Sequence, residues 1–249
     1  DLDKRKFIDM SVMGIGAVIL GYGNKHVDKA VIKSIKSSVQ TTLNSPKEYD
    51  LAEKLIELHP WFDMVRFSKS GGEAMAIAIR LARAATGRDK VLFNGYHGWL
   101  DWYLSANLKD PKSLNQHLMA GLDPNGVDTN LTGSSYSFIN EEIAILEEKF
   151  QLNEFAAIVI EPARGQEVEE STLLKLKQLC DKHGIVFIYD EITSGFREEI
   201  GGIHRRMAVK PDMAVFAKSM GNGYPISAII GTRAVMQSAE SSFISSTNW

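Results

Sequence analysis

The chain has 249 residues, of which 44% are hydrophobic and 24% are charged, and this is typical of a globular protein with one large domain. Its formal net charge of −3 excludes a general electrostatic attraction to nucleic acid or to an anionic membrane. A single cysteine excludes an internal disulfide. The sequence contains no run of eighteen apolar residues, so it predicts no membrane span, and we expect a cytoplasmic protein.

Residues 1–45 are interpreted as an N-terminal segment, and residues 46–249 as the large domain. Between Met10 and Gly23 several glycines favour tight bends, which suit the wall of a substrate pocket. The alternative is an arm that packs on its own domain or on a partner subunit. A helical pattern follows at about 26–38.

Short apolar segments alternate with helical patterns along the rest of the chain. This alternation predicts an α/β fold with a mostly parallel seven-stranded sheet and helices on both faces. Only about eight residues separate Phe216 from Ile226, too few for a parallel crossover, so the last strand should be antiparallel. The predicted strands are 64–68, 90–94, 134–138, 156–161, 185–190, 212–217 and 226–231; the further helices are 72–86, 140–150 and 171–183.

Ser70, Gly71 and Gly72 lie between the first strand and an alanine-rich helix. Glycines allow a ligand to approach the backbone, and free amides at a helix start bind phosphate. Ser70 either caps the helix or donates to the phosphate. The chain has neither GxGxxG nor GxxxxGK[ST], which leaves a nicotinamide dehydrogenase or P-loop protein with little support.

Two further strands end in polar or aromatic residues. Tyr96 and His97 follow the strand at 90–94, where a tyrosine ring can stack on a flat heteroaromatic ligand. The alternative for such aromatic residues is an ordinary core or interface position. The strand at 156–161 ends in Glu161, and Arg164 and Gln166 follow it. These groups add an acid, a cation and an amide to the same edge of the sheet.

Asp190 ends the predicted strand at 185–190, and Lys218 directly follows the one at 212–217. The carboxyl ends of parallel strands form the edge where open α/β sheets bind ligands. A partly dehydrated lysine is a nucleophile for carbonyl groups, and a carboxylate can hold a pyridinium nitrogen. Pyridoxal 5′-phosphate (PLP) requires this pair of groups. The simpler alternatives are a surface lysine at a strand end and an acid that caps a helix.

Five motifs in this order resemble those of class III aminotransferases, and among these the sequence is similar to glutamate-1-semialdehyde aminomutase and its aminotransferase relatives. The resemblance runs from about Phe7 to the end of the chain. The motifs are Ser-Gly-x-Glu-Ala, Tyr-His-Gly, Glu-Pro, Asp-Glu-x-x-(Ser/Thr)-Gly-Phe-Arg, and the lysine before Gly-Asn-Gly-Tyr-Pro-Ile.

The resemblance implies the large domain of a fold-type-I PLP-dependent transferase. Lys218 would bind PLP covalently and move a proton, and Asp190 would keep the pyridine nitrogen protonated. Tyr96 would cover the ring, with His97 beside it, and Gln166 would face the phenolic oxygen. Ser70, Gly71 and Gly72 would bind the phosphate. Glu161 and Glu191 would orient the other cofactor-binding residues.

Three positions depart from the family pattern. Lys69 and Gly72 stand where the family has an asparagine and a hydroxyl residue. The missing hydroxyl removes one donor, worth about 1–3 kcal/mol toward a charged ligand, so weaker PLP retention is expected. Arg164 replaces a residue that is often small. It is either a site for a substrate carboxylate or a surface cation.

The resemblance also bears on assembly and length. Thr247 matches the threonine that reaches the phosphate of the neighbouring subunit, which implies a homodimer. Family members carry a C-terminal small domain after the lysine region, and we expect this domain to be absent from the 249 residues. The chain is therefore interpreted as part of a longer enzyme.

The predicted function is PLP-dependent transfer of an amino group between an amino compound and a keto acid or aldehyde. The first alternative is intramolecular transfer, as in an aminomutase, and the second is a noncatalytic fragment or scaffold. The histidines show neither HExxH nor paired-cysteine spacing, so we predict no metal. The sequence does not identify the substrate.

Overall fold

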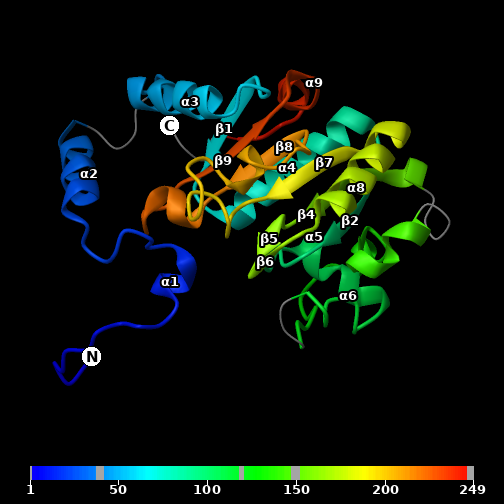
Figure 1. The fold of residues 1–249 in the computed structure, drawn as a ribbon, viewed down its shortest axis with the longest axis horizontal. Helices are drawn as coiled ribbons and strands as arrows, with labels where there is room; N and C mark the ends of the chain where they lie inside the picture. The colour runs from blue at the N-terminus through cyan, green and yellow to red at the C-terminus, as the bar shows by residue number, and fades with distance from the viewer. Residues whose placement is uncertain (1, 38–41, 118–120, 147–151, 246–249) are drawn as a thin grey trace.

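A seven-stranded sheet forms the centre of the computed structural model, which describes residues 2–37, 42–117, 121–146 and 152–245 (Figure 1). The strand order is β1-β9-β8-β7-β4-β2-β3. All seven strands lie where the sequence predicts them, which confirms the α/β fold class. The strands are β1 (Met64–Ser68), β2 (Lys90–Asn94), β3 (Ser135–Ser137), β4 (Phe155–Ile160), β7 (Val186–Asp190), β8 (Met213–Phe216) and β9 (Ser227–Gly231).

The strand β9 is antiparallel to both of its neighbours, β1 and β8, whereas the pairs β2–β3, β2–β4, β4–β7 and β7–β8 are parallel. The short connection from β8 reverses the chain direction, as its length predicts. The carboxyl ends of β2, β4, β7 and β8 therefore lie along one edge of the sheet. Ile160 pairs with Tyr189, and Asp190 pairs with Val215, so β4, β7 and β8 end at nearly the same level.

Three long helices cover the sheet. On one face, α4 (Gly71–Thr86) packs across β1, β4, β7, β8 and β9. Ser70 caps its first turn, and Gly87 ends it in the left-handed conformation with φ of 66°. On the other face, α3 (Pro46–Leu58) packs against β1 and α8 (Glu170–His183) packs against β7. Successive side chains of each strand point to opposite faces of the sheet, and they form one hydrophobic core on each face.

Two helical regions differ from the sequence prediction. Residues 140–145 form a 3₁₀ helix, and residues 147–151 lie outside the described part of the chain, so the predicted helix at 140–150 is seen only as this short turn. The helix α3 was not predicted, although Ser45 caps it and Pro46 begins it.

Short elements complete the described chain. They lie in the connections between strands, and two of them, β5 and β6, pair as a small antiparallel ribbon. They are α5 (Asp101–Leu104), α6 (Ala106–Lys109), η1 (Thr129–Leu131), η2 (Asn140–Ile145), η3 (Leu152–Glu154), β5 (Ala163–Arg164), β6 (Gln166–Glu167), η4 (Ile203–Arg205), η5 (Lys218–Gly221), α9 (Arg233–Met236) and η6 (Gln237–Glu240).

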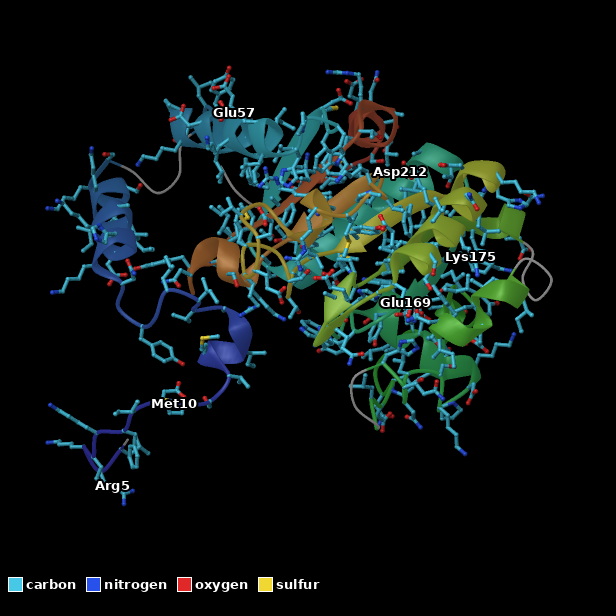
Figure 2. The ribbon with its side chains drawn as sticks, viewed as in Figure 1. Arg5, Met10, Glu57, Glu169, Lys175 and Asp212 are labelled. Atoms are coloured by element: carbon cyan, nitrogen blue, oxygen red, sulfur yellow. The ribbon has the colours of Figure 1, made fainter. Side chains whose placement is uncertain are left out.

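The N-terminal segment extends away from the sheet and carries α1 (Met13–Gly16) and α2 (Lys25–Ser37) (Figure 1). Its side chains are largely exposed: Met10 is 87% exposed, and it stands apart from the body of the molecule together with Arg5 (Figure 2). Several hydrogen bonds hold the segment to the sheet edge. Arg197 donates to the Gly16 carbonyl at 2.5 Å, and the Leu20 amide donates to Asn222 at 2.8 Å.

None of the helices in the described residues is long and apolar enough to cross a membrane.

The buried face of β2 allows a direct test of the core. We predict that Leu92→Ala lowers the free energy of unfolding by about 2–5 kcal/mol, because Leu92 is fully buried and its loss leaves a cavity. Leu174→Ala on α8 is the control, since Leu174 is 49% exposed, and its effect should stay below about 0.5 kcal/mol. Urea unfolding measures both changes, and equal losses would contradict the fold.

Candidate active site

A cavity of about 340 Å³ lies at the carboxyl ends of β4, β7 and β8, beside the N-terminus of α4. Its walls come from both predicted segments, because Ile15 and Ala17 of the N-terminal segment also line it. The other lining residues are Lys69, Ser70, Gly71, Gly72, Tyr96, His97, Gly98, Glu161, Arg164, Asp190, Ile192, Thr193, Ala217, Lys218, Gly223, Tyr224 and Ile226. Most of the site residues predicted from the sequence therefore line the same cavity.

A larger cavity of about 860 Å³ lies along β2 and β3, lined among others by Lys90, Lys109 and Tyr136. No residue predicted for the site lines it. We take the smaller cavity as the functional site, because it brings together a buried acid, a part-buried amine and a helix N-terminus.

Lys218 lies at the start of η5, directly after β8 and Ala217. Its φ of 45° is unusual for a residue other than glycine, and such strained backbone is concentrated at functional sites. Lys218 Nζ donates a hydrogen bond to Thr193 Oγ1 at 3.0 Å. Burial lowers the pKa of Lys218, the Arg164 charge lowers it further, and Asp190 opposes these effects. The site therefore disfavours the ammonium form of Lys218 relative to a lysine in water.

Asp190 ends β7 and is almost fully buried. Its Oδ1 accepts the Ile192 amide at 3.0 Å, and its Oδ2 contacts His97 Nδ1 at 2.7 Å. His97 Nε2 lies 3.2 Å from the Asn94 carbonyl oxygen, and the ring stacks on Trp102 with the ring centres 5.9 Å apart. These contacts fix the carboxylate at the cavity wall, and they turn the His97 ring toward Asp190.

Glu161 joins three parts of the cavity wall. Its carboxylate accepts the Tyr96 amide at 2.9 Å and two hydrogen bonds from Arg164, at 2.7 and 2.5 Å. The Arg164 guanidinium also lies 5.4 Å from the centre of the Tyr96 ring, a cation–π distance. A Cβ atom at Gly95 would lie 2.8 Å from Glu161 Oε2, so the close approach of this loop requires glycine.

The start of α4 combines two adjacent glycines with a capped helix end. Ser70 Oγ accepts the Glu73 amide at 3.2 Å, and its own hydrogen is still available to donate to a ligand. The Ser70 side chain can therefore fill both of the roles that the sequence left open. A Cβ atom at Gly71 would lie 2.8 Å from Ile192 Cδ1, whereas one at Gly72 would meet only Leu100, at 3.5 Å.

Two predicted residues that the structure describes do not line this cavity. Gln166 lies exposed on β6 and lines a neighbouring cavity of about 380 Å³, which shares Glu161 and Arg164 with the first. Glu191 is buried behind the site, where it accepts the Ile203 and His204 amides at 2.9 and 3.0 Å. Thr247 lies outside the described residues.

Two lining or supporting residues were given no role from the sequence. Thr193 bonds to Lys218 and also to Arg164, at 3.2 Å. Arg197 donates to the Thr193 carbonyl at 2.8 Å and to Ser219 Oγ at 3.1 Å. Arg197 belongs to the Gly-Phe-Arg motif, which is a usable signal, but no sequence pattern distinguishes Thr193.

No group of three or more histidine, cysteine or acidic side chains suited to a metal ion occurs among the described residues.

Comparison of the sequence with known families identifies the family of this chain. The profile of the class-III aminotransferases matches residues 1–248. The chain belongs to this family. A curated relative, the glutamate-1-semialdehyde 2,1-aminomutase of Francisella philomiragia, is 37% identical over 243 residues, which is 95% of this chain and 55% of the relative.

Two solved structures share the fold. An omega-transaminase from Sphaerobacter thermophilus is 29% identical with a TM-score of 0.79, over 90% of this chain and 53% of that one. A transaminase with PLP bound gives the same TM-score and coverage at 24% identity. The chain thus spans little more than half the length of the proteins it matches.

His117 supports the loop that carries Tyr96 and His97. Its Nδ1 accepts the Gly95 amide at 3.1 Å, so this nitrogen carries no hydrogen. Burial lowers the pKa of His117 to about 4, with a further contribution from His97. The neutral ring is therefore part of the folded site.

We predict that this histidine makes stability depend on pH. Above pH 6.5 the ring is neutral in both states, and between pH 6.5 and 4 only the unfolded state binds the proton, so stability falls with falling pH. His117→Asn keeps an acceptor but does not titrate. Between pH 7 and 4 the unmodified protein should lose about 3 kcal/mol more than this variant. Urea unfolding at each pH measures the difference, with exposed His26→Asn as control; equal losses would contradict the assignment.

Proposed function

We propose that the protein transfers an amino group with PLP as cofactor. The observation that carries this proposal is the single cavity that joins the Lys218 amine, the Asp190 carboxylate and the N-terminus of α4. A carbonyl-bearing pyridine with a phosphate needs these three groups: an amine, an acid and a set of backbone amides. Family membership adds independent support.

The residues of this chain fit the cofactor. The cavity volume of about 340 Å³ suits a small planar ligand. Glycine at position 71 lets the start of α4 pack directly against Ile192 of the cavity wall, where a Cβ atom would clash. Lys218 would hold the carbonyl carbon, Asp190 the ring nitrogen, and Ser70 with the first amides of α4 the phosphate. When bound, PLP supplies an electron sink for a proton lost from the substrate carbon.

The protein side chains supply binding and proton transfer. The lowered pKa of Lys218 raises the share of neutral amine, the form that would attack a carbonyl and carry a proton between two carbons. The buried Asp190 offers a negative charge to a protonated ring nitrogen, and His97 keeps its carboxylate in place. Tyr96 lies at the cavity wall, where its ring can cover a flat ligand.

Two reaction types share these steps. An aminotransferase passes the amino group to a separate keto acid or aldehyde, and an aminomutase returns it to a neighbouring carbon of the same molecule. The curated relatives are named aminomutases, which supports the second reaction type as the alternative to an aminotransferase. An assay of the full-length protein with an amino donor, with and without a keto acid, separates the two.

We also propose a cytoplasmic homodimer, in which the N-terminal segment contributes to the pocket. The exposed apolar side chains of that segment, such as Ile8 and Met10, support contact with a partner chain. Sedimentation that shows an active monomer would exclude it. A noncatalytic scaffold is the competing proposal, and the intact pair of Lys218 and Asp190 argues against it.

The proposal predicts covalent attachment of PLP to Lys218. Incubation with PLP, reduction with borohydride and peptide mass spectrometry should give a pyridoxyl group on the Lys218 peptide. Lys218→Arg removes the nucleophile and should lose the label, while Lys210→Arg should keep it. Label spread over exposed lysines, with none on Lys218, would favour the scaffold.

The phosphate cradle gives a second prediction. Gly72→Ser should lower the PLP dissociation constant about five- to tenfold, because a hydroxyl adds one hydrogen bond and Leu100 leaves room for the Cβ atom. Gly71→Ser should weaken binding, because its Cβ atom displaces Ile192. Equilibrium dialysis with PLP measures both constants. Equal effects of the two substitutions would show that the phosphate binds elsewhere.

A further inference from the structure

Thr193 connects the nucleophilic lysine to an arginine. Its Oγ1 accepts a hydrogen bond from Lys218 Nζ at 3.0 Å and another from Arg164 Nη2 at 3.2 Å. Two cationic side chains therefore share one neutral acceptor, and their nitrogen atoms lie within about 6 Å of each other. Such an arrangement opposes a positive charge on the lysine.

Arg164 is held in this place by its other contacts. Its Nε and Nη2 atoms donate to the buried carboxylate of Glu161, and its guanidinium lies over the Tyr96 ring. Although burial opposes the charged form, hydrogen bonding to Glu161 raises the pKa of Arg164. The arginine charge is therefore permanent at any pH where the protein is folded.

Several other groups face Lys218. Asp190 and Glu161 attract a cation, and Arg197 repels it together with Arg164. The contribution of Arg164 is the larger of the two repulsions. Further titratable side chains of the cavity wall are Lys69, Tyr96, His97 and Tyr224.

We propose that Arg164 and Thr193 form a positioning pair for Lys218, in which the arginine charge disfavours the ammonium form and the shared hydroxyl holds the amine at the cavity. A threonine hydroxyl can accept from an ammonium and can also donate to a neutral amine. Thr193 thus keeps its contact with Lys218 when the lysine loses its proton. The importance of this pair for amino transfer rests on the proposed function, but its effect on the amine does not.

The test measures the amine directly, without PLP. Isotopically labelled acetic anhydride is applied to the cofactor-free protein over a range of pH, and mass spectrometry gives the acetylation rate of the Lys218 peptide. Arg164→Gln removes the repelling charge and leaves Glu161 uncompensated. The acetylation rate of Lys218 near pH 7 should therefore fall roughly tenfold, with its midpoint at higher pH.

Three variants separate charge from structural support. Arg164→Lys retains the charge, so its midpoint should stay close to that of the unmodified protein. Thr193→Val removes the shared hydroxyl but keeps both charges, so the rate at high pH should change without a rise in the midpoint. Arg206→Gln is the control, since Arg206 bonds to Glu167 and Glu198 outside the cavity, and it should change neither quantity.

The outcomes distinguish this inference from the proposed function. An unchanged midpoint in Arg164→Gln, or an equal shift in Arg164→Lys, would overturn the positioning role. Thermal unfolding of each variant shows whether it is folded, and Thr193→Val gives an independent measurement if Arg164→Gln is not. If the midpoint shifts as predicted while PLP never labels Lys218, the inference stands and the proposed function fails.

Discussion

The site depends on how the parallel strands end. Because β4, β7 and β8 finish at nearly the same level, the residues that follow them meet at one edge of the sheet, where Asp190 and Lys218 face a common cavity. The left-handed backbone at Lys218 costs on the order of 1–3 kcal/mol, which the fully buried strands on either side offset. The sheet thus holds a strained lysine where an unsupported loop would relax.

Electrostatics in the cavity follow from this convergence. Two acids and two arginines act on the Lys218 amine, and the hydrogen bonds between Glu161 and Arg164 join one acid to one arginine. This pairing leaves the second acid, Asp190, in contact with His97. A buried carboxylate and a nearby amine can therefore act on the same ligand without forming a direct ion pair with each other.

Much of this could be predicted from the sequence, because the signals are local. Unbroken apolar runs give the strands, the short link before Ile226 gives the antiparallel strand, and Ser45 with Pro46 was an available but unused signal for α3. The neighbours of each side chain are set by tertiary packing. Gly165 turns the chain between β5 and β6, so Arg164 lines the central cavity while Gln166 faces the adjacent one.

Thr193 illustrates the same limit. Its position after Asp190 and Glu191 gives no hint that its hydroxyl lies between a lysine 25 residues later and an arginine 29 residues earlier. That contact arises only when β4, β7 and β8 are assembled side by side. The strand ends predict which residues meet at the sheet edge, and the packed structure decides which atoms touch.

A crystal structure of the protein soaked with PLP tests the central claim most directly. The account predicts one PLP molecule with its ring nitrogen against Asp190, its carbonyl carbon joined to Lys218 and its phosphate at the first amides of α4. Density for PLP at another surface, or a ring that reaches only one of the two side chains, would contradict it.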